Sequence, residues 1–207
     1  MNLRIGLIAI LMALTALAPA GVQAAGKDDP VAAAPGASGA SEDARLGETD
    51  LIYSEKKLDD QILSFGYRTL ECQLPDAIEA FGAQSINLEP GVFLHLVPCE
   101  MADLNISYYA VLETAGKFEL IEFQQSSAEE ENTNPSLMTN AAWDKKTGTL
   151  TGRRYYSQNM DCGSFERHRL ALEEHAFYLM EYRQKDECDG RQQKPETYPL
   201  LWNGEGG

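Results

Sequence analysis

The sequence predicts an α+β fold: one or two N-terminal helices followed by a mostly antiparallel β-meander that is held by disulfides. Three observations support this prediction. Apolar residues recur with helical spacing before Pro90 and with a period of two beyond it. Short turn sequences join the strand-like runs, which is typical of hairpins between antiparallel strands. The chain of 207 residues also carries an even number of cysteines, four.

Residues 1–24 have the layout of a secretory signal peptide. Arg4 is followed at once by the apolar run 5–18, and then by Pro19 and small residues that end at Ala24. The apolar run is too short to cross a hydrocarbon core of about 30 Å, which argues against a membrane anchor. We therefore expect cleavage after Ala24, no membrane insertion of the mature chain, and a periplasmic or secreted location.

The mature chain is expected to begin with a disordered linker and to continue as one globular domain. Residues 25–50 consist mainly of Ala, Gly, Pro, Ser and acidic residues, with almost nothing to bury. Such an acidic, Ala/Gly/Pro-rich composition predicts disorder. The remaining residues, 51–207, are enough for a single domain with one core.

Two segments at the start of this domain have helical patterns. Apolar residues follow helical spacing within 51–70, although Gly66 interrupts the pattern. The segment 73–83 is clearer, because Pro75 suits a first helical turn and Gly82 suits the exit from a helix.

The residues that follow are expected to form about seven antiparallel strands. Hairpins are predicted where apolar alternation continues on both sides of a turn sequence. Their turns are Thr114–Gly116, Asp144–Gly148 and the region near Glu173–Glu174. In the last of these hairpins, alternation separates two faces, one of which carries Phe165, Arg167 and Arg169.

The four cysteines are Cys72, Cys99, Cys162 and Cys188. In an exported chain an even count predicts a disulfide framework, because no reducing thiol pool protects free thiols there. Three pairings are possible. Pairing of sequence neighbours closes two loops of similar length, and each bond then stabilises the fold by about 3.5 kcal/mol in the chain-entropy model. We predict that both disulfides form and that Cys162 pairs with Cys188.

No pattern in the sequence predicts a catalytic residue, a metal ligand or a cofactor. The histidines, His95, His168 and His175, share no motif with a cysteine, so a thiolate nucleophile is not expected. A zinc site would need closely spaced cysteines or paired histidines. Asp144 could begin a calcium loop, but the required ladder of ligands is missing. The sequence has neither a phosphate-binding glycine loop nor a serine elbow.

The net charge of −15 is unevenly distributed along the chain. Residues 25–144 hold 6 Lys and Arg against 22 Asp and Glu, whereas residues 145–194 hold 10 against 8. Such a field repels nucleic acid and anionic lipid and favours a basic protein partner, although it could serve solubility alone. The expected partner-binding residues are Glu113, Glu122, Glu129, Glu130 and Glu131.

Several short motifs together resemble a known family. They are "LHLVPC" ending at Cys99, "WDKKTGTLTG", "DCG" around Cys162, Cys188 with Gly190, and the closing "YPLLW". In this order they are similar to a widespread family of exported bacterial proteins that is known only as a domain of unknown function. The resemblance covers about residues 91–202. It implies a periplasmic or secreted, disulfide-bonded module, and it implies no activity.

These observations favour a non-catalytic exported envelope protein that binds another macromolecule, for example as an inhibitor of a cationic enzyme such as a lysozyme. One alternative is an envelope hydrolase that uses carboxylates, which the many acidic residues permit. A second alternative is a structural or stress-related envelope component. A pocket with converging Asp or Glu side chains would favour the hydrolase.

Overall fold

The computed structural model of the protein describes residues 49–126 and 134–204, all within the compact unit Ser41–Gly207. The expected signal peptide, residues 25–48 of the expected linker, and Glu129, Glu130 and Glu131 lie outside the described residues. Within the described ranges, no helix is long and apolar enough to cross a membrane.

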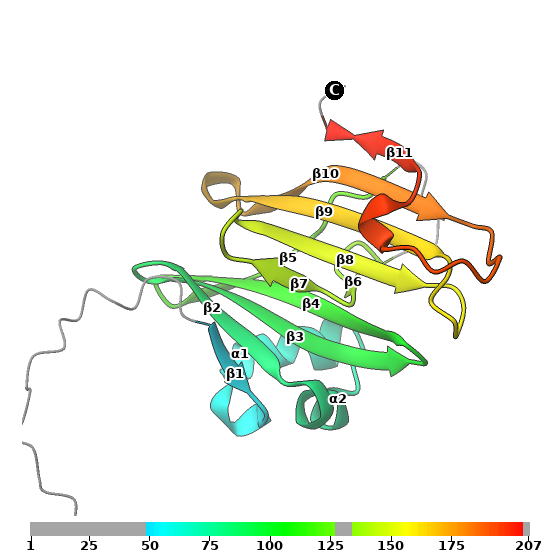
Figure 1. Ribbon diagram of the computed structural model, residues 1–207. Coiled ribbons are helices and arrows are strands. Elements are labelled where there is room, and N and C mark those ends of the chain that lie inside the picture. Colours follow the sequence, from blue (N-terminus) through cyan, green and yellow to red (C-terminus); the bar gives the residue numbers. More distant parts are fainter. Residues whose placement is uncertain (1–48, 127–133, 205–207) are drawn as a thin grey trace, which may run out of the picture. The chain divides into compact units, whose positions relative to one another are not determined.

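The first sheet is an antiparallel meander in which sequence neighbours pair (Figure 1). Its strands lie in the order β1-β2-β3-β4-β5, and the short strand β6 pairs with β4. The strands are β1 Thr49–Ile52, β2 Ala83–Glu89, β3 Val92–Ala102, β4 Asn105–Thr114, β5 Lys117–Ile121 and β6 Met138–Thr139.

The second sheet is also an antiparallel meander, and its strands lie in the order β11-β10-β9-β8-β7. The bounds of these strands are β7 Ala142–Asp144, β8 Thr149–Tyr155, β9 Gly163–Ala171, β10 Ala176–Lys185 and β11 Leu200–Asn203. The mostly antiparallel meander that the sequence predicts is therefore present, divided between two sheets. The described strands number eleven instead of about seven, because β1, β6 and β11 are too short to show alternation and β2, Ala83–Glu89, lies before the segment in which alternation predicts strands.

The helices are few and short. Helix α1, Asp60–Ser64, begins after Asp59, whose carboxylate accepts a hydrogen bond of 2.8 Å from the backbone N–H of Gln61. A single π-helical turn, Phe65–Thr69, follows. Helix α2, Leu74–Phe81, has Pro75 in its first turn and ends at Gly82, where φ is 71°. Three further segments form 3-10 turns: Glu55–Lys57, Leu172–Glu174 and Pro195–Thr197.

The helix expected within 51–70 is wrong in its first part. Leu51 and Ile52 belong to β1, whose register pairs Thr49 with Ile86 and Ile52 with Ala83 in β2. This long-range pairing supplies backbone hydrogen bonds that override the local helical spacing. For the same reason Thr49 and Asp50, which composition assigns to the disordered linker, are part of the sheet.

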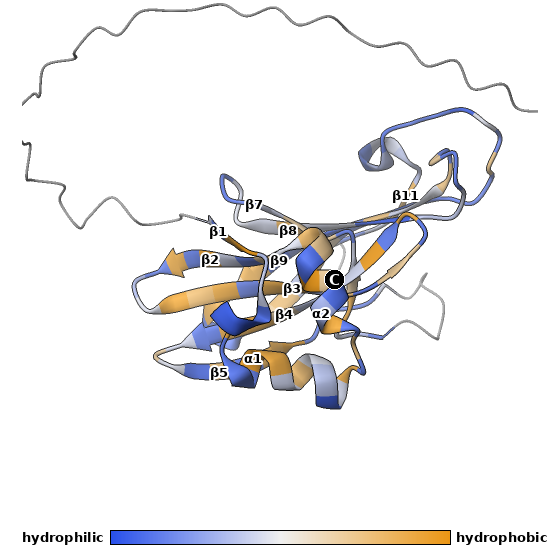
Figure 2. Cartoon of the chain, turned by 90° about the horizontal axis from the view of Figure 1, so that it is seen from below, coloured by the Kyte–Doolittle hydropathy of each residue, from blue (hydrophilic) through white to orange (hydrophobic). Residues whose placement is uncertain are grey.

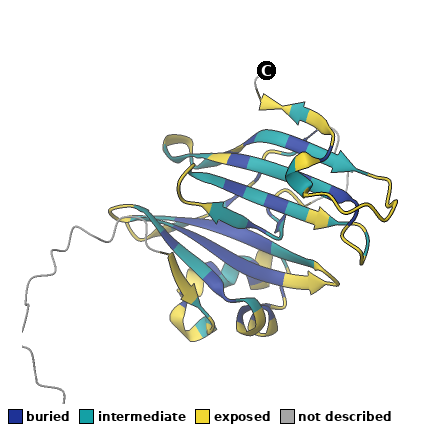
Figure 3. Ribbon diagram, viewed as in Figure 1, coloured by how far each residue is buried: buried dark blue, intermediate teal, exposed yellow. Residues whose placement is uncertain are grey.

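The described residues are arranged in three layers: helices, first sheet and second sheet. One apolar cluster joins Ile62 of α1 and Ile78 of α2 to Val97 and Val111 of the first sheet. A second cluster lies between the two sheets. The first sheet is therefore buried on both faces, and Figures 2 and 3 show its central strands as apolar and buried. Two clusters thus replace the single core that chain length predicts.

The second sheet has one inner and one outer face. Leu150 and Phe177 point inward and join the cluster between the sheets. Strand alternation then turns the neighbouring residues outward, and the register places Thr151 beside Arg167 and Arg153 beside Phe165. The segment around Pro195–Tyr198 packs over part of this outer face, where Glu196 contacts Arg153 and the Tyr198 carbonyl accepts a hydrogen bond from Arg183. Thr147 and Arg169, on the same face, are exposed to solvent.

Candidate ligand-binding groove

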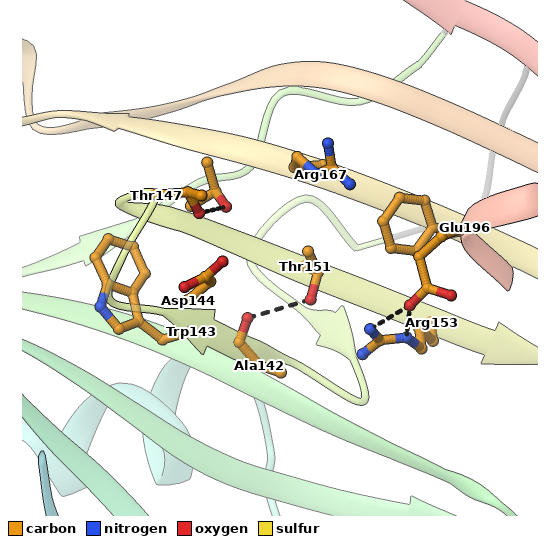
Figure 4. A pocket seen from close by; sticks show the side chains of 10 residues that line it. Ala142, Trp143, Asp144, Thr147, Thr151, Arg153, Arg167 and Glu196 are labelled. Atoms are coloured by element: carbon orange, nitrogen blue, oxygen red, sulfur yellow. Dashed lines mark hydrogen bonds and ion pairs between the residues drawn. The ribbon is translucent and has the colours of Figure 1, made fainter. Parts of the chain in front are cut away.

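A groove lies on the outer face of the second sheet (Figure 4). It has a volume of about 450 Å³ and is open to solvent. Strands β7, β8 and β9, the turn between β7 and β8, and the segment before β11 all contribute to it. The lining residues are Ala142, Trp143, Asp144, Thr147, Thr149, Thr151, Arg153, Phe165, Arg167 and Glu196.

Two guanidinium groups contact the ring of Phe165 at one end of the groove. The guanidinium carbons of Arg153 and Arg167 lie 5.7 and 5.5 Å from the ring centroid. Carboxylates hold both groups in place. Arg153 donates from Nε (3.0 Å) and Nη2 (2.5 Å) to Oε1 of Glu196, and Nη1 of Arg167 lies 3.2 Å from Oε2 of Glu181. A guanidinium has five N–H donors, so these contacts leave donors for a ligand.

Hydroxyl groups occupy the middle and the far end of the groove. The hydroxyls of Thr147 and Thr149 lie 2.7 Å apart, and that of Thr151 donates to the carbonyl of Ala142 at 3.3 Å. Asp144 accepts a hydrogen bond from the N–H of Lys146 at 2.9 Å. The groove therefore presents groups that only donate, groups that only accept and groups that do both.

The two carboxyl groups of the groove both remain ionised near neutral pH. Hydrogen bonds from the Lys146 N–H and then from the Thr147 hydroxyl hold the pKa of Asp144 below its ordinary value. Burial raises the pKa of Glu196, but the hydrogen bond from Arg153, a backbone hydrogen bond and the positive charges of Arg153 and Lys194 together outweigh it, so this pKa is also lowered. Figure 4 shows the two side chains toward opposite ends of the groove. Neither is suited to donate a proton.

The acidic residues expected to bind a partner are not brought together within the described residues. Glu113 is half-buried and lies 3.1 Å from Nε2 of His95, while Glu119 contacts Nδ1 of His175 at 2.8 Å. Glu122 is exposed just beyond β5. Because Glu113 pairs with Phe118 at the other end of β5, it lies about 13 Å from Glu122 along the strand direction.

The cysteines form two disulfides between sequence neighbours, Cys72–Cys99 and Cys162–Cys188. The prediction that the fold is disulfide-bonded is confirmed. Side-chain ligand atoms of Asp161, Cys162 and Cys188 lie within 4.8 Å of one another. Both sulfurs are bonded to each other, however, so they offer no thiolate to a metal ion.

The residues around Cys162 explain the sequence Asp161-Cys162-Gly163. Asp161 is buried, and its carboxylate accepts hydrogen bonds from the Ser157 hydroxyl and the Gly190 N–H. It thereby ties together the two chain segments that the disulfide joins. A Cβ atom on Gly163 would lie 2.0 Å from the carbonyl oxygen of Arg154, so only glycine fits between β8 and β9 there.

Each of the three histidines is paired with a glutamate. His168 is fully buried and lies 2.9 Å from Glu166, and an edge of its ring meets Phe123. Burial lowers the pKa of His95, against the opposing effect of Glu113. The imidazole of His95 is thus neutral at physiological pH. With every cysteine in a disulfide, none of these histidines can activate a thiol.

We expect the Asp161 carboxylate to make the free energy of unfolding depend on pH in the acidic range. The hydrogen bonds from Ser157 and then Gly190 hold its pKa below the ordinary value of 3.8. Its stabilising contribution is therefore present above the unfolded-state pKa and is lost as the pH falls below about 4. Urea unfolding from pH 7 to 2.5 should show a steeper loss of free energy of unfolding for the wild type than for Asp161→Asn. Parallel curves would contradict this assignment.

The fold and the site define a class: a disulfide-bonded protein of mostly antiparallel sheets, with a polar groove on an open sheet face. The chain belongs to the family described as "Protein of unknown function (DUF1176)", whose family model matches residues 13–204. The resemblance inferred from short motifs is confirmed, and the match extends well beyond residues 91–202. No curated protein and no solved structure matches the chain.

Proposed function

We propose that this protein is an exported binding protein that holds another macromolecule in the groove of the second sheet without catalysing a reaction on it. The observation that carries the proposal is the clamping of Arg153 and Arg167 around Phe165 by Glu196 and Glu181. Side chains that are fixed before binding lose little conformational entropy when a ligand arrives. The two disulfides are compatible with an exported protein.

The shape of the groove favours a macromolecular ligand. Its residues Thr149, Thr151 and Arg153 stand on one strand and span about 13 Å. The groove is open along this length. A pocket for a small molecule usually encloses most of its ligand, whereas an open groove suits a segment of a longer chain.

The ionisation of the groove carboxyl groups argues against the rival hydrolase. A carboxylate-based glycoside hydrolase needs one carboxylic acid whose pKa is raised, so that it can protonate the leaving group. The pKa values of both Asp144 and Glu196 are lowered instead. A purely structural or stress-related role would leave the fixed polar groups of the groove without a use.

The proposal is tested by binding of the purified protein to an envelope fraction from the source cell. We expect Arg167→Gln to weaken retention about tenfold, because a hydrogen-bonded charge is worth roughly 1.5–3 kcal/mol. Arg154→Gln is the matched control: Arg154 is exposed, carries the same charge and points away from the groove on β8. Equal retention of the wild type and both variants would rule out the groove as the binding site.

The acidic first half of the domain supports a second candidate function, the capture of a basic protein such as a cationic enzyme. Residues 49–126 carry 4 Lys and Arg against 13 Asp and Glu. Attraction by exposed charges weakens with salt, because the screening length falls from about 10 Å at 0.1 M to about 3 Å at 1 M. Retention of a basic protein that depends on salt and on Glu122, but not on Arg167, would favour this candidate.

A further inference from the structure

We propose that the macromolecule held in the groove is a saccharide chain that carries carboxylate groups. This inference rests on the proposed function and adds the chemical class of the ligand. It follows from the kinds of polar group in the groove, from the arginines beside it, and from the charge of the remainder of the chain.

The polar groups of the groove match the hydroxyl groups of a sugar. A sugar hydroxyl donates one hydrogen bond and accepts others, so it is best satisfied between a donor and an acceptor. Arg153 supplies donors, Asp144 supplies acceptors, and the hydroxyls of Thr147 and Thr149 can do either. Trp143 also borders this end of the groove, but its side chain lies on the same face as Leu150 and packs on the cluster between the sheets, with its ring 6.5 Å from that of Phe177, so the sugar contacts in the groove are polar.

The arginines on β9 favour carboxylate groups on the saccharide. Arg167 and Arg169 are two residues apart on the same face of the strand, so their Cα atoms are separated by about 7 Å. The side chain of Arg167 is 42% exposed and meets Glu181 through one nitrogen. Arg169 is exposed beside Thr149, and among the described residues no carboxylate lies within ion-pair distance of it. A guanidinium binds a carboxylate with two parallel hydrogen bonds.

The charge of the rest of the chain disfavours a denser polyanion. The net charge is −15, and a nucleic acid duplex carries one negative charge per about 1.7 Å. Residues 134–204, which include the whole second sheet, hold 10 Lys and Arg against 10 Asp and Glu, in contrast to the strongly acidic first half. A saccharide with at most one carboxylate per sugar meets the arginines while experiencing less repulsion from the remaining surface.

Calorimetric titration with oligogalacturonate tests the inference, and the same oligomer with its carboxyl groups methyl-esterified is the neutral control. We expect the acidic oligomer to bind the full chain and the ester to bind about tenfold more weakly or not at all. The double variant Arg167→Gln, Arg169→Gln should bind the acidic oligomer about tenfold more weakly than the wild type does. Arg154→Gln should change the affinity less than about twofold, whereas Arg167→Gln, which removes the same single charge from the groove side, should weaken binding more.

Each other outcome overturns a defined part of the inference. Equal binding of acid and ester would remove the role of the carboxylate. Equal losses in the single variants Arg167→Gln and Arg154→Gln would indicate attraction by overall charge. Tighter binding of inorganic polyphosphate than of oligogalacturonate would exclude a saccharide. If no saccharide binds while envelope retention still depends on Arg167, the ligand class is wrong and the proposed function stands. If retention is independent of Arg167, the proposed function itself fails.

Discussion

Replacing Cys162 and Cys188 together by alanine is expected to lower the free energy of unfolding by about 3.5 kcal/mol. The bond joins residues 26 apart in the sequence, and its loss frees that loop in the unfolded chain. Domains of this size are stable by only about 5–15 kcal/mol, so the expected loss is a large share. Urea unfolding of the variant and the oxidised wild type measures the difference.

The second disulfide provides a matched control for this experiment. Cys72 and Cys99 are 27 residues apart, so their replacement by alanine frees a loop of almost the same length. If restriction of the unfolded chain is the main effect, the two double variants lose similar stability, within about 1 kcal/mol. A loss below about 1 kcal/mol on removal of Cys162–Cys188 would contradict the structural role assigned to this bond.

Gly163→Ala is expected to destabilise the protein by about 2–4 kcal/mol. The new Cβ would lie 2.0 Å from the carbonyl oxygen of Arg154, where β8 and β9 pair, so one strand must move. Gly148→Ala is the control, because φ is 64° at Gly148 but nothing lies within 4 Å of an added Cβ. There we expect a loss of only about 1 kcal/mol from backbone strain. Similar losses in the two variants would show that the close approach at Gly163 is not the cause.

Local sequence signals predict the parts of the fold that depend on neighbouring residues. The hairpin turn at Ala115 and Gly116, with φ values of 50° and 75°, follows from its glycine between two alternating runs. The turn Asp144–Gly148 is closed by the hydrogen bond from the Gly148 N–H to the Asp144 carbonyl, as predicted. Helix α2 likewise has Pro75 in its first turn and ends at Gly82, the two residues that predict its ends.

The parts that depend on long-range pairing could not be predicted. Strand β1 pairs with β2, more than thirty residues later, and nothing in its four residues indicates that partner. The division of the meander into two sheets has the same cause. It arises after β5, because β6 pairs back to β4 while β7 begins a separate sheet.

The groove could not be predicted, because its residues come from distant parts of the sequence. Glu196 lies 43 residues after its partner Arg153, and the register that places Arg153 beside Phe165 cannot be read from either strand alone. One signal did point to it: alternation puts Phe165, Arg167 and Arg169 on one face of β9. The uneven charge predicts a partner site that includes Glu113, but the structure pairs Glu113 with His95.

Site-specific photo-crosslinking tests most directly the claim that the groove binds a macromolecule. A photoreactive residue is introduced in place of Thr147, which is exposed and lines the groove, or in place of Lys56, which is exposed in the turn before α1. A third variant carries it at Glu122. After illumination with an envelope fraction, we predict a crosslinked product from position 147 and none from position 56. Crosslinking from position 122 alone, or equally from all three positions, would contradict the claim.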